Sequence, residues 1–96
     1  MISKVAYIIS YDISDTKKRN KVAKVLEEYG ERIQYSVFIC YLERKILFKL
    51  LERVTKLIDK TTDSIIAMAI TDQTAIIYGT LKNNVRKEKP ETWNII

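Results

Sequence analysis

One aspartate stands where an apolar segment gives way to a polar one near the amino terminus. Asp12 follows Tyr11 after the apolar run 5–9, and the polar residues beyond it lead into an expected helix. If the run is a strand, the carboxylate lies at the edge of a sheet, where α+β domains commonly bind ligands. Asp12 is therefore a candidate functional residue. A turn aspartate that accepts hydrogen bonds from nearby backbone N–H groups would give the same pattern.

Arg19 is the second residue whose position suggests a function. It precedes Val22, Ala23 and Leu26 by three, four and seven residues, so it heads the core-facing stripe of the expected helix. On that face its guanidinium group is directed toward the sheet edge near Asp12, where it could bind a phosphate. The alternative is an arginine that only packs its aliphatic stem at the start of the helix.

Four even-numbered residues form a third group, because alternate residues of a strand share one side. They are Arg32, Gln34, Ser36 and Phe38. A guanidinium group, an amide, a hydroxyl group and a ring on one side resemble a surface that touches nucleic acid, although Phe38 also suits the core or a subunit contact. The group does not match the aromatic signatures of RNA-recognition motifs. With two glycines in the chain, a glycine-rich phosphate loop is not expected.

The composition excludes several kinds of catalytic site. The chain has no histidine, which rules out Ser–His and Cys–His nucleophile pairs and histidine-rich metal sites. Its single cysteine, Cys40, lies in an apolar run and permits neither an intrachain disulfide nor a CxxC metal site. The net charge of +5 favours an anionic partner such as nucleic acid, although a surface rich in lysine and glutamate would carry the same excess incidentally.

The length and the amino-terminal segment indicate one small domain. A chain of 96 residues has room for a single core, and dimerisation would add to the limited surface that it buries. The amino-terminal apolar run is too short, and too soon followed by polar residues, for a signal peptide or a membrane span. We therefore expect a cytoplasmic protein with no membrane partner.

The first third of the chain predicts a strand followed by a helix. Residues 4–12 are apolar, β-branched and aromatic, which indicates a strand covered on both faces. A helix is expected over residues 16–29, with its N-cap at Ser14–Asp15 and with Gly30 as a left-handed C-cap.

The remaining two-thirds predict strands on either side of a second helix. Residues 32–42 have strand chemistry but are long for one strand, so a bend or a hairpin near Tyr35–Ser36 is plausible. The clearest helix covers residues 43–60, where apolar residues recur at helical spacing. Two further strands are expected over 64–70 and 75–78.

The order of these elements predicts a ferredoxin-like α+β fold, the split-βαβ arrangement with two helices on one face of a mostly antiparallel sheet. We assign residues 1–81 to this domain and residues 82–96 to a carboxy-terminal tail. Residues 82–91 are polar and charged, which is typical of a linker, and the tail ends in the apolar segment Trp93–Ile96. An extra strand that docks on a dimer mate or another partner and a disordered end both fit that segment.

Several sequence blocks together resemble the hallmark motifs of the CRISPR-associated Cas-two family. In chain order they are Tyr11-Asp12-Ile13-Ser14-Asp15, Arg19-Asn20, Gly30, Arg32-Ile33-Gln34-Tyr35-Ser36-Val37-Phe38 and Asp63-Ser64. Each block is short, but the set occurs in order and at suitable spacings over nearly the whole chain. The resemblance implies a ferredoxin-like homodimer that takes part in spacer acquisition.

The resemblance also implies partners and residue roles. In this family a dimer lies between two dimers of the Cas-one integrase and holds the duplex DNA that is inserted as a new spacer. Some members are described as metal-dependent endonucleases on single-stranded RNA or duplex DNA, and there the aspartate that matches Asp12 is the metal ligand and catalytic residue. The residues that match those associated with activity or substrate contact are Tyr11, Arg19, Arg32 and Phe38.

Cleavage by such a chain is expected to depend on a metal ion. Without histidine, phosphodiester hydrolysis needs a divalent metal, Mg²⁺ or Mn²⁺, that activates water. These ions prefer several oxygen ligands, and one chain offers Asp12 with Asp15 nearby in sequence. We therefore expect two copies of Asp12 to face each other across a dimer axis, with Arg19 and Arg32 positioning phosphates. The alternatives are a non-catalytic DNA-binding scaffold and a toxin-type ferredoxin-like ribonuclease.

Overall fold

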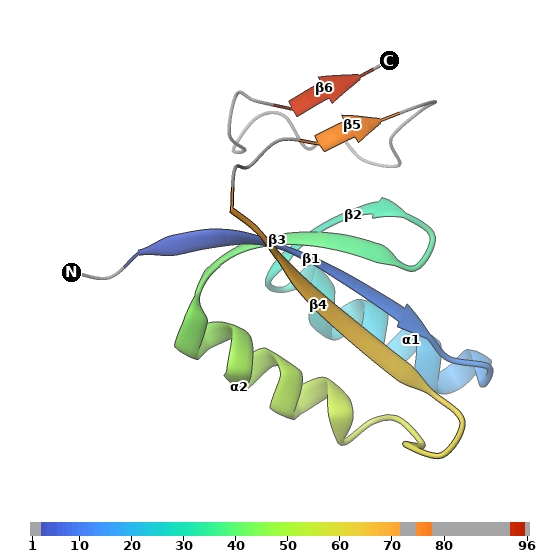
Figure 1. Cartoon of the computed structure of the whole chain (residues 1–96). Helices are drawn as coiled ribbons and strands as arrows, with labels where there is room; N and C mark the ends of the chain where they lie inside the picture. Colours follow the sequence, from blue (N-terminus) through green and yellow to red (C-terminus); the bar gives the residue numbers. More distant parts are fainter. Residues whose placement is uncertain (1–2, 72–74, 78–92, 96) are drawn as a thin grey trace.

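In the computed structural model, four antiparallel strands form one sheet and two helices cover one of its faces (Figure 1). The structure describes residues 3–71, 75–77 and 93–95. In spatial order the strands of the sheet are β2 (Gly30–Gln34), β3 (Val37–Glu43), β1 (Lys4–Asp12) and β4 (Ser64–Ile70). The helices α1 (Thr16–Glu27) and α2 (Arg44–Thr55) connect β1 to β2 and β3 to β4. The predicted ferredoxin-like α+β fold is confirmed.

β1 lies between two neighbours in the sheet, as its continuous apolar character predicts. It pairs antiparallel with β3 and with β4, so that Tyr7 lies opposite Cys40 on one side and Ala69 on the other. Its odd-numbered residues belong to the core beneath the helices, which includes Tyr7 and Ile9. Its even-numbered residues lie on the other face of the sheet because successive side chains of a strand alternate.

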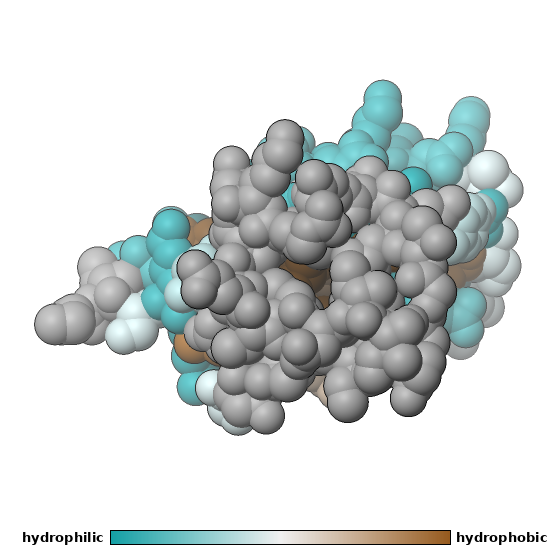
Figure 2. Space-filling view, turned by 90° about the horizontal axis from the view of Figure 1, so that it is seen from above, coloured by the Kyte–Doolittle hydropathy of each residue, from teal (hydrophilic) through white to brown (hydrophobic). Residues whose placement is uncertain are grey.

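That other face carries none of the helices in the described part of the chain, and we call it the helix-free face. From Ala6 onward, its residues are the even-numbered residues of β1 and their partners across the ladders: Ala6, Ile8, Ser10 and Asp12 in β1, Val37, Ile39 and Tyr41 in β3, and Ser64, Ile66, Met68 and Ile70 in β4. Ala6 and Ile39 are buried, but Tyr41, Ile66 and Met68 are 37%, 56% and 57% exposed. In Figure 2, which views the molecule from this side, hydrophobic residues are visible near the centre and hydrophilic ones along the upper right edge.

α1 begins where the sequence predicts but ends two residues early. The Asp15 carboxylate caps it by accepting a hydrogen bond of 2.9 Å from the backbone N–H of Lys18. The prediction for Gly30 is wrong, because this residue starts β2 and does not adopt a left-handed conformation. The glycine serves a close approach instead: a Cβ atom there would collide with the carbonyl oxygen of Ile39 and lie 2.6 Å from Cys40 Sγ.

α2 is shorter than the helix predicted over residues 43–60. Its buried residues, all in the predicted stripe, are Leu47, Leu50 and Val54. The helix ends at Thr55, and a turn follows in which Asp59 Oδ1 accepts a hydrogen bond of 3.0 Å from the backbone N–H of Thr61. Such side-chain bonds to the backbone compete with helix formation. Neither of the two described helices is long and apolar enough to cross a membrane.

Residues 32–42 belong to a hairpin, the second of the two possibilities left open by the sequence. The turn lies at residues 35–36, and β3 returns antiparallel beside β2. Arg32 lies opposite Phe38, and the register shifts between Arg32 and Gln34. Such an irregularity locally bends and twists a ladder.

β5 (Ala75–Ile77) and β6 (Trp93–Ile95) form a separate pair of parallel strands. The pair lies on the side of the helix-free face, opposite to the helices (Figure 1). Part of the tail therefore pairs with a strand of its own chain. The linker expected over residues 82–91 lies outside the described residues, and the division of the chain at residue 81 stays a prediction.

Candidate nucleic-acid interface

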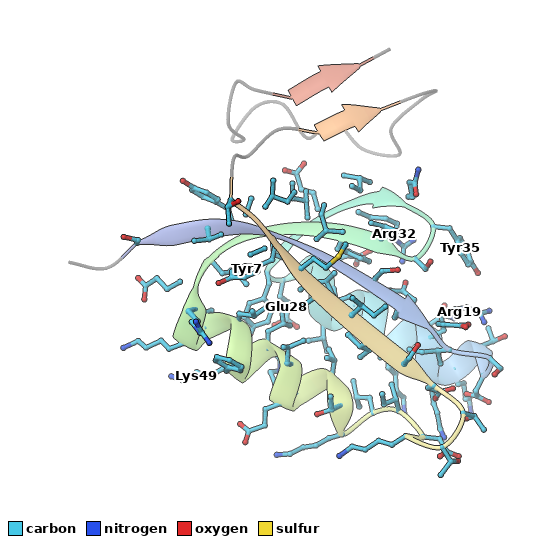
Figure 3. All side chains as sticks on the ribbon, in the orientation of Figure 1. Tyr7, Arg19, Glu28, Arg32, Tyr35 and Lys49 are labelled. Carbon is cyan, nitrogen blue, oxygen red and sulfur yellow. The ribbon has the colours of Figure 1, made fainter. Side chains whose placement is uncertain are left out.

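Four of the five residues singled out in the sequence meet at one end of the sheet. Tyr11 lies near the end of β1, Arg19 in the first turn of α1, and Arg32 and Phe38 on the β2–β3 hairpin. The hairpin turn adds Tyr35, and Figure 3 shows the two arginines and Tyr35 at this end of the molecule. We call these five residues the hairpin-end cluster.

Two aromatic rings form the buried base of the cluster. Tyr11 and Phe38 are 5% and 0% exposed, and their ring centroids lie 6.3 Å apart with the planes tilted by 32°. Both rings belong to the core beneath the helices. For Phe38 the structure therefore favours the core interpretation, because a ring with no exposed surface does not contact a substrate directly. Its contribution to the site is to support the residues around it.

Arg32 packs against this aromatic base. It lies opposite Phe38 in the ladder, and its guanidinium carbon is 5.2 Å from the centroid of the Phe38 ring, within range of a cation–π interaction. Burial raises the pKa of Tyr11 above its ordinary value, and the charge and hydrogen bond of Arg32 offset only part of that rise. Tyr11 therefore keeps its proton at physiological pH.

The neutral Tyr11 anchors the hairpin turn to β1. Its hydroxyl group donates a hydrogen bond of 3.4 Å to the backbone carbonyl of Tyr35. Its backbone N–H donates one of 3.1 Å to the carbonyl of Ser36. The tip of the hairpin is thus attached at two points to the strand that ends at Asp12.

Arg19 is held by the loop between β1 and α1, and it does not form an ion pair with the aspartate. Its Nη1 donates to the carbonyls of Ile13 at 2.9 Å and Ser14 at 3.3 Å. Its Nη2 donates to Thr16 Oγ1 at 3.1 Å. The guanidinium carbon lies 5.9 Å from the centroid of the Tyr35 ring. Arg19 therefore connects the β1–α1 loop with the tip of the hairpin.

Asp12 ends β1 with its side chain exposed on the helix-free face, opposite Ser64. The chain beyond it is fixed, because Ile13 is buried and its carbonyl accepts a hydrogen bond from Arg19. No residue in the described part of the chain donates a hydrogen bond to the Asp12 carboxylate, so the turn-aspartate interpretation finds no support. The carboxylate extends from a fixed backbone into solvent, on the opposite face from Tyr11.

One chain does not complete a metal site around Asp12. Among the residues that the structure describes, no three acidic or cysteine side chains gather closely enough to hold a metal ion. Asp15, the nearest acidic residue in the sequence, is engaged in capping α1. A divalent ion at Asp12 would therefore need further oxygen ligands from a second chain or from the substrate.

Tyr35 is the member of the cluster that sequence reasoning missed as a site residue. The expected strand face of alternating side chains is divided by the hairpin turn, which leaves Tyr35 62% exposed. The bend expected at Tyr35–Ser36 was the available signal, because an aromatic ring at the tip of a hairpin has little core to join. Of the predicted face, Arg32 and Phe38 remain side by side.

Comparisons of the sequence with known proteins point to one family. The profile described as CRISPR associated protein Cas2 matches residues 5–75. A relative from Thermus thermophilus, named CRISPR-associated endonuclease Cas2 2, is 37% identical over 76 residues, which cover 79% of this chain and 84% of the relative. A relative from Chloroflexus aurantiacus, named CRISPR-associated endoribonuclease Cas2 3, is 42% identical over 80 residues, and the match covers 79% of this chain and 85% of the relative.

Solved structures share the fold as well. The crystal structure of a hypothetical protein from Thermus thermophilus superposes with a TM-score of 0.77 at 36% identity, over 84% of this chain and 98% of that one. The crystal structure of Streptococcus pyogenes Cas2 gives a TM-score of 0.66 at 30% identity, over 70% of this chain and 87% of that one. The similarity therefore extends over most of the chain in both sequence and structure.

Proposed function

Because the chain belongs to the CRISPR-associated Cas2 family, we propose that it acts in spacer acquisition as a nucleic-acid-binding homodimer. In this role the dimer holds duplex DNA together with the Cas-one integrase in the cytoplasm. Metal-dependent cleavage of single-stranded RNA or duplex DNA at Asp12 is the second part of the proposal. The names endonuclease and endoribonuclease carried by relatives support that part.

The observation that carries the proposal is the hairpin-end cluster, which lies at the same end of the sheet as Asp12. Arg19 and Arg32 are each held against an aromatic ring, so their positive charges stay at fixed places. Guanidinium groups bind phosphate with good geometry, and the amino-terminal end of α1 adds favourable backbone dipoles near Arg19. With a net charge of +5 on the chain, this end of the sheet is suited to bind a nucleic-acid backbone.

The helix-free face supports the homodimer. Ile66 and Met68 remain more than half exposed there, even though β5 and β6 lie on the same side of the sheet. Exposed apolar patches of this kind mark interaction surfaces, and contact between two identical faces would bury them in a symmetric interface. Asp12 lies on the same face, so such a contact would bring two carboxylates into one interface.

Paired Asp12 carboxylates would give a divalent ion the oxygen ligands that one chain lacks. Mg²⁺ or Mn²⁺ bound there supplies the positive charge that activates water and offsets charge on the phosphate. In this arrangement Asp12 is the metal ligand, while Arg19 and Arg32 position the phosphates. Phe38 and Tyr11 act indirectly, by holding Arg32 and the hairpin turn.

A cleavage assay tests the role of Asp12. Wild type, Asp12→Asn and the control Glu52→Gln are incubated with labelled single-stranded RNA or duplex DNA, in Mg²⁺, Mn²⁺ or EDTA. Asp12→Asn is expected to lower the metal-dependent rate by at least about 100-fold, because it removes the ligand charge that holds the metal. Glu52→Gln removes the same charge from the exposed surface of α2 and should cleave like wild type.

Each outcome of this assay decides a part of the proposal. Equal cleavage by wild type and Asp12→Asn refutes the catalytic role of Asp12. Binding without cleavage by both proteins removes the nuclease part and leaves the scaffold. A pull-down with purified Cas-one integrase tests the partnership, and cleavage of RNA without any binding of the integrase favours a toxin-type ribonuclease.

A further inference from the structure

We propose that the Tyr35 ring is a stacking platform for an unpaired nucleobase. The inference rests on the proposed nucleic-acid binding and specifies the substrate further. The strand that binds at the hairpin end carries at least one base that is not paired in a duplex. The observations behind it are the exposure of Tyr35, its fixed backbone and the arginine that lies against its ring.

The exposure of this ring has no explanation in the packing of the domain. Tyr35 is 62% exposed, the most exposed of the large hydrophobic side chains in the described part of the chain. Its neighbours in the cluster, Tyr11 and Phe38, are buried and form the core beneath it. An aromatic ring held in solvent at a charged site is suited to bind another ring.

The ring is also held in place before any ligand arrives. Its backbone carbonyl accepts the hydrogen bond from the Tyr11 hydroxyl group, and the next residue, Ser36, accepts one from the Tyr11 backbone. The guanidinium carbon of Arg19 lies 5.9 Å from the centroid of the ring, and three hydrogen bonds hold the guanidinium group to the β1–α1 loop and to the first residue of α1. A platform fixed in this way loses little conformational freedom when a base stacks on it.

The position of the ring relates it to the rest of the site. The β1–β3 ladder ends with Ser10 opposite Val37, and beyond it the hairpin turn reaches Tyr35 where β1 reaches Asp12. A strand whose phosphate is bound by Arg19 at this end of the sheet therefore passes close to the Tyr35 ring. Figure 3 shows Arg19 and Tyr35 at this same end.

Stacking on a protein ring requires a base whose face is uncovered. In a duplex the faces of each base are covered by its neighbours, so a protein ring stacks on a base that is unpaired or displaced from the helix. Every base has a π face, so such a contact tolerates any sequence. The platform is thus expected to favour single-stranded segments over continuous duplex, without reading their sequence.

A binding experiment in EDTA tests the platform without requiring cleavage. Fluorescence anisotropy measures binding to three labelled probes: a single-stranded DNA about 12 nucleotides long, the same backbone with abasic spacers in place of bases, and the corresponding duplex. The proteins are wild type, Tyr35→Ala, Tyr35→Phe and the control Phe48→Ala. Phe48 is a matched control because, like Tyr35, it is an exposed ring beside an arginine. It is 56% exposed on α2, and the centroid of its ring lies 5.5 Å from the guanidinium carbon of Arg44.

The stacking role predicts a loss that depends on the bases. Tyr35→Ala should weaken binding of the single-stranded DNA by roughly 5- to 100-fold and should leave the abasic backbone and the duplex nearly unchanged. Tyr35→Phe should bind like wild type because it keeps the ring, and Phe48→Ala should bind like wild type as well. Circular dichroism of each variant confirms that it is folded.

Two results would overturn the inference while leaving the proposed function in place. One is binding of the single-stranded DNA by Tyr35→Ala as tightly as by wild type. The other is an equal loss on all three probes, which would show a structural or purely electrostatic role for Tyr35. Failure of wild type to bind any probe at low salt would instead refute the proposed nucleic-acid binding, and the platform with it.

Discussion

Arg19 and Arg32 each lie against an aromatic ring. Their guanidinium carbons lie 5.9 Å from the ring of Tyr35 and 5.2 Å from the ring of Phe38. A cation–π contact contributes about 0.5–1 kcal/mol at an exposed site and about 2 kcal/mol when it is shielded from water. A cation–π contact does not neutralise a guanidinium group, so these rings do not compete with a phosphate for its charge. At the scale of single residues, the site therefore depends on rings that do not themselves touch the phosphate.

Substitutions of Phe38 test its contribution to stability and to the placement of Arg32. Phe38→Ala is expected to lower the free energy of unfolding by about 3–5 kcal/mol because the side chain is fully buried, and Phe38→Leu by roughly half as much. Urea unfolding followed by circular dichroism measures both. Folded Phe38→Leu keeps the core filled but loses the ring that holds Arg32, so it should bind single-stranded DNA roughly 2- to 5-fold more weakly than wild type. A folded Phe38→Leu protein that binds as tightly as wild type would show that the ring does not position Arg32.

The β2–β3 hairpin is the element that assembles the site. Its turn carries Tyr35, and its ladder sets Arg32 opposite Phe38. At the far end of the same ladder, Gly30 lies opposite Cys40, where β2 approaches β3 too closely for a Cβ atom. Because β2 and β3 form one ladder, the close packing at Gly30 lies in the same hairpin as the turn that carries Tyr35.

Gly30→Ala tests the close approach within the hairpin. The added methyl group would meet the backbone of β3 as well as Cys40 Sγ, so we expect a loss of about 1–3 kcal/mol in the free energy of unfolding. Thermal unfolding measures the effect, with Gln34→Ala as a control because Gln34 is exposed in the same strand. If the two variants are equally stable, the close-approach explanation of Gly30 is wrong.

On the scale of the whole molecule, the two faces of the sheet differ. The helices close one face, and their carboxy-terminal ends are joined by Arg53, which donates hydrogen bonds of 3.0 Å to both Glu28 and the Tyr29 hydroxyl group. The hydrogen bond from Arg53 holds the pKa of Glu28 below its ordinary value, so the ion pair persists under mildly acidic conditions. The helix-free face instead leaves Ile66 and Met68 exposed, and the proposed dimer would bury these two side chains.

Met68→Lys tests the dimer through that face. A lysine placed within an apolar interface loses hydration without gaining a partner, so we expect dimerisation to weaken by about tenfold or more. Sedimentation equilibrium gives the dissociation constant. Phe48→Lys is the matched control, because Phe48 is 56% exposed on the helix side and Met68 is 57% exposed on the other. Equal dissociation constants for Met68→Lys and wild type would exclude this face as the interface.

Most of the fold could be predicted from local patterns in the sequence. The bounds of β1 and β4 follow from their apolar runs, and the start of α1 follows from its N-cap at Asp15. The predicted ends of the helices are less accurate, because a helix end depends on competing local hydrogen bonds such as the one that Asp59 accepts after α2. The hairpin was one of two possibilities, since an eleven-residue strand-like segment contains no signal that decides between a bend and a turn.

The sequence by itself determined which chemistry is available: one aspartate at a strand end, two arginines, and no histidine. It also determined the fold class, because periodicity and caps are local properties of the chain. Only the tertiary structure decided that Phe38 is buried, that Tyr35 is exposed, and that Gly30 serves a close approach. These facts depend on which strand lies opposite which, and pairings between distant residues leave no mark on the spacing of residues along the chain.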